Sequence, residues 1–565
     1  MKPQEGRSEG AHSGPTVISR REWLLVGSSA AVLLLAVAVL HLQGLRHAPA
    51  GGRWSGFIGT YTNDYYGYLA WIRQARDGWF LFREQFTTEP HGRVFFHPLF
   101  WLAGVIPRVT GLPLMTGWWL VQALCTVALP LALYRFLAET TGDRAVRLTA
   151  FAIAMTGSGL GWLWGNLDGV PWERRPIDLW MPESGIFHTL TTSFFTLSAA
   201  LAIMLMIFLH ALRLARDGRR GDAVAMGLWT TALLAVHPYD VVEAGGVSAV
   251  FVLLLARNRW KECLLAGAIA TPYAAYCAAV VFLDPVFSAH RGAVMERPTL
   301  GVTAAGFGVP LIAALVGAFL PGVRALLREI RFLLVWLAAG FVATQLPLGF
   351  ERKLLWGLSV PLAALAAGAA VHALRRVATG SQSAAKARLI VAGGLAAFVA
   401  LCGTGSVIHF WGEFQSLGQG SPDDSVQAEA LDAFRWLEVS ALPGDAILAG
   451  PGIAAMIPGM TGRTVFAGHW AQTIDLQEKS QFTRLLFGPA PTGSLGHIES
   501  VLRRNGIRWA VLDAASRSLL GLRGSDESLA VSKLGRIRFR NRLVTIWQID
   551  QGEPIPWRSG NWLGR

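Results

Sequence analysis

Long apolar stretches separated by short polar ones run along the first 408 residues of the chain. A helix that crosses a bilayer needs roughly 17–25 such residues. The first stretch follows Arg20 and Arg21 and has no convincing small-residue cleavage site, which is typical of an uncleaved signal anchor. We predict eleven crossings, at 24–42, 115–137, 148–165, 190–212, 222–236, 241–257, 262–282, 301–320, 331–347, 353–375 and 388–408.

The loops between these spans alternate in charge. The basic loops carry Arg144 and Arg147, then four arginines within 213–220, and further basic groups within 257–261, 324–331 and 375–388. The other loops hold the acids Asp168, Glu173, Asp178, Glu183, Asp240, Glu243, Asp284 and Glu296. Basic loops stay in the cytoplasm. We therefore expect an integral protein of a bacterial cytoplasmic (inner) membrane, with the N-terminus inside and the C-terminus outside.

Two outer segments, 43–114 and 166–189, are too long to be simple turns. The first contains an amphipathic helical pattern, NDYYGYLAWIRQARDGW, and a short apolar piece at 95–106. That piece is too short to span and is expected to lie at the membrane surface or to be re-entrant. The second is rich in Trp, Pro and acids, a composition typical of irregular backbone facing water or protein.

Beyond residue 408 the pattern changes to helices alternating with short apolar strands such as DAILAG and IRWAVLD. This alternation predicts a small α/β domain. The expected organisation is a cytoplasmic tail at 1–22, a membrane domain at 23–408 and an outer α/β domain at 409–565. The fold class is thus mainly α, a polytopic helical membrane protein with a C-terminal extracytoplasmic domain.

Composition agrees with a membrane protein. Only 15% of the residues are charged and 52% are hydrophobic, whereas a soluble domain carries about 25% charged residues. The 50 Lys and Arg exceed the 37 Asp and Glu, giving a formal charge of +13. Because the excess is sorted by loop, it indicates orientation and not nucleic-acid binding. The four cysteines are isolated in apolar runs, without zinc or disulfide spacing.

Asp64 is the sharpest candidate for chemistry, because it opens the amphipathic helix of the first outer segment. It could be a helix N-cap, or a carboxylate that deprotonates an acceptor hydroxyl or binds a metal at the membrane boundary. Arg352 and Lys353, in GFERKL, end a span on the outer side. They could bind a lipid-linked phosphate or simply anchor the helix in the interface.

Other polar groups are weaker candidates. His237 and Asp240, in HPYDVV, could line a site, although Asp240 could instead cap the next helix. Glu89, with His91 and His97, could offer metal ligands or be scattered loop residues. The loop with His469 and Trp470 could contact sugar or be structural. The glycine run at 157–161 is expected to pack closely inside a span.

The order of these motifs resembles the GT-C superfamily of integral-membrane glycosyltransferases, in its uncharacterised bacterial members. The resemblance covers residues 20–400 and rests on TNDYYGYLAWIRQARDG, TTEPHGRVFFHPLFWLAG, GSGLGWLWG, MPESGIF, HPYDVV and GFERKL. It implies inverting transfer of a hexosyl or pentosyl group from a polyprenyl-phosphate-linked donor. The acceptor would be a glycan, lipid or protein on the extracytoplasmic face.

The resemblance also implies roles for residues. Asp64 matches the early catalytic or metal-binding acid, Glu183 is expected to be the second acid and Asp178 its substitute, and Arg352 would bind phosphate. A divalent metal, Mg or Mn, is a possible cofactor, but the second outer segment has no paired DxD or ExD. A WWDYG-type motif is absent too, which argues against peptide N-glycosylation.

Two other classes of function remain open from the sequence. A transporter or lipid flippase would usually carry ionisable groups near the membrane midplane, whereas the acids here collect outside the predicted spans. A non-catalytic scaffold could keep the fold and bind a partner through its outer domain.

Overall fold

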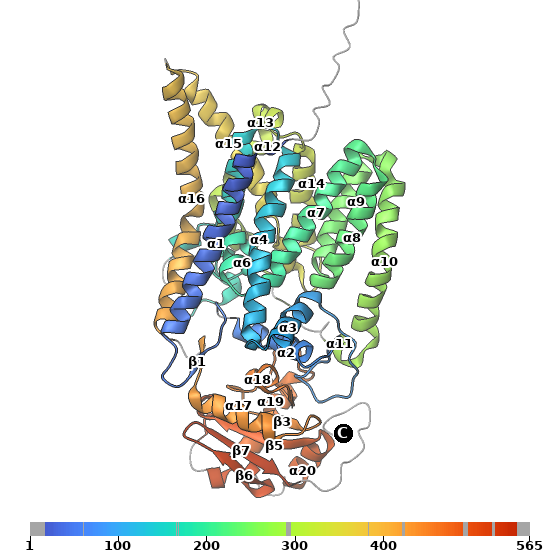
Figure 1. Cartoon of the computed structure of the whole chain (residues 1–565), viewed down its shortest axis with the longest axis vertical. Helices are drawn as coiled ribbons and strands as arrows, with labels where there is room; N and C mark the ends of the chain where they lie inside the picture. The colour runs from blue at the N-terminus through green and yellow to red at the C-terminus, as the bar shows by residue number, and fades with distance from the viewer. Residues whose placement is uncertain are drawn as a thin grey trace, which may run out of the picture.

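A bundle of long helices stands on a small α/β domain (Figure 1). The computed structural model describes residues 17–59, 61–164, 167, 169–289, 295, 297–381, 383–420, 424–489, 495–522 and 526–550. The prediction of a mainly helical membrane protein with a C-terminal α/β domain is confirmed.

Seven helices in the described part are long and apolar enough to cross a membrane. They are α1 (Arg20–Arg46), α4 (Leu114–Thr140), α7 (Phe195–Asp217), α10 (Trp260–Leu283), α12 (Leu300–Phe319), α15 (Ser359–Ala378) and α16 (Ala384–Gly418). The other four predicted spans coincide with shorter helices, α5 (Arg144–Thr156), α8 (Arg220–Val236), α9 (Asp240–Leu255) and α14 (Ile330–Ala343). Short helices α11 (Pro285–Ala289) and α13 (Pro321–Leu326) lie in the connections.

Helices α7 and α15 form the centre of the bundle. Their apolar windows are 83% and 89% buried, against 17% for α10 and α16. The outer helices expose large apolar side chains such as Leu264 and Leu401. Exposed apolar surface of this extent is unfavourable in water but favourable against lipid, so the protein is an integral membrane protein.

The end of the bundle where α1 begins lies opposite the α/β domain (Figure 1). The predicted cytoplasmic arginines belong to this end, since Arg147 forms an ion pair with Glu22 in the first turn of α1. Arg375 reaches Asp143 at 2.6 Å. Arg147 and Arg375, from two of the basic loops, therefore lie at the same end of the bundle.

The predicted span at 148–165 is too long, because α5 ends at Thr156 and Gly157 caps it in extended backbone. An irregular segment follows, with turns η1 (Gly161–Leu163), η2 (Trp172–Arg174), η3 (Ile177–Leu179) and η4 (Pro182–Ser184) and helix α6 (Ile186–Thr191). Gly159 does pack closely, since a Cβ there would collide with the Gly306 carbonyl oxygen. It does so from this irregular segment and not from within a helix. Facing it, α12 is kinked at Gly308, whose φ is 49°.

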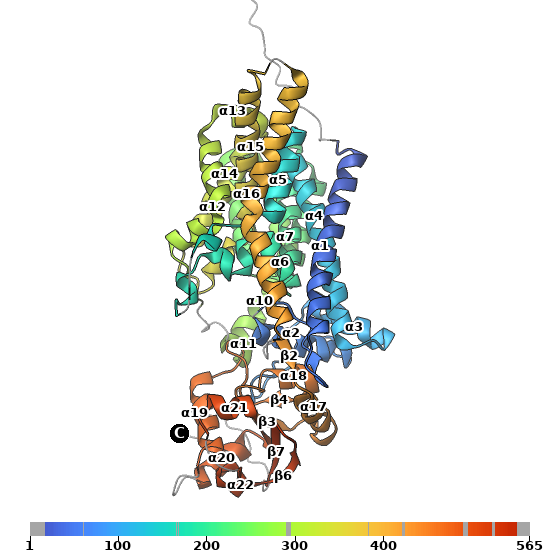
Figure 2. The same ribbon diagram turned by 90° about the vertical axis from the view of Figure 1, so that its left-hand side faces the viewer.

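The first outer segment lies between the bundle and the α/β domain in both views (Figures 1 and 2). It contains α2 (Thr62–Arg76) and α3 (Pro98–Thr110), close to the predicted helices. Strand β1 (Arg53–Trp54) pairs antiparallel with β2 (Ser425–Val426), just after α16. The segment thus connects the two parts of the protein.

The C-terminal domain is built on a five-stranded mixed sheet in the order β4-β3-β5-β7-β6. The strands are β3 (Ala446–Ala449), β4 (Thr464–Val465), β5 (Ile507–Asp513), β6 (Gly535–Arg540) and β7 (Val544–Ile549). The helices are α17 (Ala428–Ser440), α18 (Met456–Thr461), α19 (Leu476–Phe487), α20 (Leu495–Arg504), α21 (Ala514–Leu519) and α22 (Val531–Leu534). The short turn η9 (Asp526–Ser528) also belongs to this domain, whereas the turns η5 (Arg257–Arg259) and η7 (Glu351–Leu355) belong to the membrane bundle.

Side chains of the central strands alternate between two cores, as the twofold repeat of a strand requires. Trp509 and Val511 face α17 and α18, whereas Ala510 and Leu512 face α19 and α20. Ala70 of α2 joins the first of these cores. The α/β domain therefore shares buried apolar surface with the first outer segment.

Candidate functional site

Asp64 lies in the first turn of α2, but it does not cap the helix. The N-cap is Tyr61, and no side chain makes a capping hydrogen bond there. The N-cap interpretation of Asp64 is therefore wrong. Its carboxylate is instead bound by side chains that follow it in sequence by about 400 residues.

These side chains belong to the loop after β4. Trp470 donates its indole N–H to Oδ1 of Asp64 at 2.8 Å, and Nε2 of His469 lies 3.3 Å from the same oxygen. The side chain of Asp64 is 28% exposed. Burial raises the pKa of this carboxyl, but the hydrogen bond from His469 and its electrostatic interaction, the hydrogen bond from Trp470 and the charge of Lys353 outweigh it and leave the pKa below its usual range. Asp64 is thus a carboxylate at neutral pH.

Tyr61 connects Asp64 with the second predicted acid. Its phenol lies within electrostatic range of Glu183, Arg352 and Asp64. Burial, then the negative charge of Glu183, raises the pKa of Tyr61 well above its usual value, so it is a neutral hydrogen-bonding group. We refer to Tyr61, Asp64, Glu183, Arg352 and Lys353 as the Tyr61 cluster.

The two cations of the Tyr61 cluster come from η7, which contacts η4 of Glu183. The guanidinium of Arg352 lies 5.4 Å from the centre of the Trp180 ring, and Nζ of Lys353 lies 5.0 Å from that of Tyr239. Among the residues that the structure describes, neither cation forms an ion pair, and Nε of Arg352 is buried without a hydrogen-bond partner. Two cations held against aromatic rings and left unpaired are suited to an anion.

Glu183 and Asp178 differ in their surroundings. Glu183 is 6% exposed and forms no hydrogen bond or ion pair within the described part of the chain. Asp178 accepts a hydrogen bond from the Gly161 amide at 3.1 Å and thereby connects η3 to η1. Burial raises the pKa of Asp178 to about 6. These contacts favour a structural role for Asp178, and the role of Glu183 as the second acid stays a prediction.

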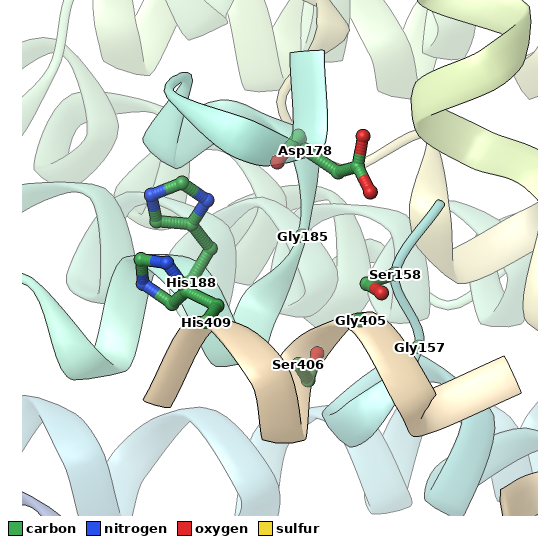
Figure 3. Close-up of a pocket in the computed structure, with 9 residues that line it drawn as sticks. Gly157, Ser158, Asp178, Gly185, His188, Gly405, Ser406 and His409 are labelled. Atoms are coloured by element: carbon green, nitrogen blue, oxygen red, sulfur yellow. The ribbon is translucent and has the colours of Figure 1, made fainter. Parts of the chain in front are cut away.

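A small polar pocket lies beside Glu183, lined by Asp178, Ser184, His188 and His409 together with Ser158, Ser406 and three glycines (Figure 3). The rings of His188 and His409 are 4.1 Å apart, and the carboxylate of Asp178 points away from them (Figure 3). Burial puts the pKa of His188 well below its usual value, so its ring is neutral. No sequence motif indicated this pocket, because His409 comes from α16, more than 200 residues after His188.

The HPYDVV motif lies next to the Tyr61 cluster, since the ring of its Tyr239 contacts Lys353. Asp240 is fully buried at the start of α9, with its Oδ1 3.0 Å from Nδ1 of His237. It makes no capping hydrogen bond. The expected capping role is therefore wrong, and the two side chains form a buried pair.

Glu89 lies away from the Tyr61 cluster, at the contact between the first outer segment and the α/β domain. Nζ of the fully buried Lys479 lies 2.7 Å from Oε1 of Glu89. His91 accepts from the Glu84 amide, and His97 is the N-cap of α3. All three side chains interact with other groups of the protein, which favours the interpretation that they are structural loop residues.

The acids and histidines near Asp64 are the side chains that could bind a divalent metal. Within the described residues, no group of three or more His, Cys, Asp or Glu side chains is arranged to hold a metal ion. The imidazole nearest Asp64 faces it across a hydrogen bond. These residues do not fit a three-ligand site. A divalent metal as a possible cofactor stays a prediction.

Comparison with solved structures identifies the architecture. ArnT from Cupriavidus metallidurans in the apo state matches with 14% identity and a TM-score of 0.52, covering 93% of this chain and 98% of that one. The structure of ArnT bound to undecaprenyl phosphate matches with 14% identity and a TM-score of 0.53, over 94% and 98% of the two chains. This chain has the GT-C fold.

The comparison also found an oligosaccharyltransferase from Archaeoglobus fulgidus, tethered to an acceptor peptide. It matches with 13% identity and a TM-score of 0.49, covering 92% of this chain and 74% of that one. No protein-family model and no curated protein matches the chain. The matches with ArnT confirm the predicted GT-C resemblance at the level of the fold.

Proposed function

We propose that this protein is an inverting glycosyltransferase that takes a sugar from a polyprenyl-phosphate donor on the extracytoplasmic face of a bacterial inner membrane. One observation carries the proposal. At the α/β-domain end of the GT-C bundle, the ionised Asp64 lies within electrostatic range of Lys353; among the described residues, Oδ2 of Asp64 forms no hydrogen bond and Lys353 forms no ion pair.

The chemistry follows from the charges in the Tyr61 cluster. An acceptor hydroxyl donates a hydrogen bond to Asp64, whose Oδ1 already takes the bonds from His469 and Trp470, so Oδ2 is the oxygen available. The acceptor oxygen attacks the anomeric carbon and its proton passes to Asp64. The bond between that carbon and the phosphate oxygen breaks, and polyprenyl phosphate leaves with the electron pair.

Arg352 and Lys353 would stabilise the leaving phosphate. Negative charge accumulates on that group in the transition state, and a guanidinium can bind two of its oxygens at once. Glu183 would accept hydrogen bonds from hydroxyl groups of the sugar. The structure of ArnT bound to undecaprenyl phosphate supports this donor class, since that protein has the same fold.

The proposal is tested with purified protein in lipid nanodiscs. The donors are radiolabelled polyprenyl-phosphate hexoses and pentoses, and an envelope extract supplies glycan, lipid and protein acceptors. We expect label to move to an acceptor with release of polyprenyl phosphate. We also expect Arg352→Gln to weaken donor binding, whereas the matched Arg435→Gln, on an exposed face of α17, leaves it unchanged. Equal donor binding by both variants, or no transfer from any donor, would reject the proposal.

A further inference from the structure

The loop at residues 468–473 of the α/β domain is fitted closely to the N-terminal half of α2. The side-chain amide of Asn63 donates to the Gly468 carbonyl at 3.3 Å, and the Trp470 amide donates to Oδ1 of Asn63 at 3.4 Å. Together with the two bonds to Asp64, these contacts join the loop to consecutive residues of α2. The catalytic acid of the membrane domain therefore lies against the outer domain.

The orientation of His469 is fixed by its own loop. The amides of Ala471 and Gln472 donate to Nδ1 of His469 at 3.1 and 3.2 Å. A ring nitrogen that accepts carries no hydrogen, so the hydrogen of the neutral ring is on Nε2. Nε2 is the atom that faces Asp64. His469 is thus a hydrogen-bond donor to Asp64 and has no lone pair there to take a proton.

Hydrogen bonds through Thr473 hold the loop at residues 468–473 in place. Oγ1 of Thr473 accepts from the amides of Gly468 and His469 at 3.1 Å each and donates to the Phe86 carbonyl at 3.0 Å. His469 is only 4% exposed. Its donor is therefore held in one place relative to the first outer segment.

Gly67, one turn after Asp64, leaves the space that the imidazole occupies. A Cβ at this position would lie 3.2 Å from Nε2 of His469 and 3.1 Å from Oε1 of Gln472. Such contacts are tighter than normal van der Waals packing, so the ring would have to move. A glycine in the interior of a helix costs about 0.5–1 kcal/mol relative to alanine, and here its small size accommodates His469.

We infer that His469 and Trp470 are positioning residues, through which the outer domain holds Oδ1 of Asp64 and directs Oδ2 at the acceptor hydroxyl. The inference rests on the proposed function. It makes the α/β domain part of the active site and not merely a module attached to it. Two donors on one oxygen restrain the position of Oδ1 and thereby help to orient the carboxylate.

Histidine variants test the inference kinetically. His469→Phe keeps an aromatic ring but removes the donor, and we expect kcat to fall about 10- to 100-fold with little change in KM for the donor, as misplacement of a reacting group produces. His469→Gln retains an N–H at the position of Nε2 and should recover most of this loss. His497→Phe, on the exposed side of α20, is the control and should keep full activity.

A measurement without turnover separates the two proposals. In protein labelled with ¹⁵N-histidine, the signal that disappears in His469→Gln belongs to His469, and we expect its shifts to report hydrogen on Nε2. Hydrogen on Nδ1, or equal kcat in His469→Phe and wild type, would overturn the inference. If wild type transfers no sugar, the proposed function fails, while the ¹⁵N shifts still establish whether the donor to Asp64 exists.

Gly67→Ala is a second variant that does not remove any hydrogen-bonding group. We expect reduced kcat, because the added Cβ displaces His469 by a few tenths of an ångström while the helix itself is favoured. Gly246→Ala in α9 is its control, since a Cβ there would meet nothing within 4 Å. Wild-type kcat in Gly67→Ala together with wild-type ¹⁵N shifts would count against close positioning.

Discussion

The ion pair between Lys479 and Glu89 provides a quantitative test of how the α/β domain is attached. Nζ of Lys479 lies 2.7 and 2.9 Å from the two carboxylate oxygens and donates to Oγ1 of Thr87 at 3.0 Å. Lys479 is 0% exposed and the side chain of Glu89 is 11% exposed. A pair this buried gains Coulomb energy only while both partners are present, because each charge alone has lost its water.

The magnitude follows from that desolvation. Removing one partner of a buried pair costs about 3–5 kcal/mol, whereas replacing both by apolar groups is often nearly neutral. We therefore expect Lys479→Met and Glu89→Leu each to destabilise the contact by about 3 kcal/mol. The double variant should lose much less than the sum. By comparison, Arg435→Met breaks the exposed Arg435–Asp432 pair and should cost at most about 1 kcal/mol.

Native-state hydrogen exchange measures these values locally, without requiring that the whole membrane protein unfold in one step. The amides of α19 and of residues 84–89 report opening of the contact in each variant. Additive losses in the double variant, or a loss in Lys479→Met no larger than in Arg435→Met, would refute the assignment of this pair as a domain anchor.

Two further predictions concern the irregular segment after α5. Because burial raises the pKa of Asp178 from 3.8 to about 6, the folded state binds the extra proton, so stability should fall by at most about 3 kcal/mol as pH rises from 4 to 6. Asp178→Asn should remove that dependence in thermal melts, and an unchanged pH dependence would exclude Asp178 as its source. Gly159→Ala should lower the melting temperature, at a cost of about 1–3 kcal/mol for overpacking against Gly306. Gly27→Ala, with open space around its Cβ, should not, and equal melting temperatures would contradict the close packing.

Much of the bundle could be predicted because long apolar runs have few alternatives in a membrane. The predictions failed where the local composition does not determine the backbone conformation. Residues 157–165 are apolar enough to look like a span, but close glycine contacts end α5 at Thr156. Helix α16 continues to Gly418, ten residues past the predicted span, since a helix does not have to end where the apolar run ends.

Strand β6 was not predicted, since its sequence GRIRFR is charged and its pattern mostly exposed. It lies at the edge of the sheet, where charged side chains are tolerated and discourage further pairing. By contrast, the strands that were predicted in this domain, DAILAG (β3) and IRWAVLD (β5), are apolar and lie inside the sheet and not at its edge.

The candidate site was predicted in part. Asp64 and Arg352 were singled out by position and charge and Glu183 by the GT-C resemblance, and all three interact electrostatically with Tyr61. The sequence could not show that His469 and Trp470 bind Asp64, because the contact joins residues about 400 positions apart. Tyr61 itself lies in an aromatic-rich helix start where several tyrosines look equivalent.

The most direct test of the central claim is the turnover of Asp64→Asn. Asparagine keeps the size and can still accept from Trp470, but it cannot take the acceptor proton. With a polyprenyl-phosphate sugar that wild type uses, we predict a loss of about 10²- to 10⁴-fold in kcat, the range for a general base, at nearly unchanged donor binding. Transfer at the wild-type rate by Asp64→Asn would contradict the account.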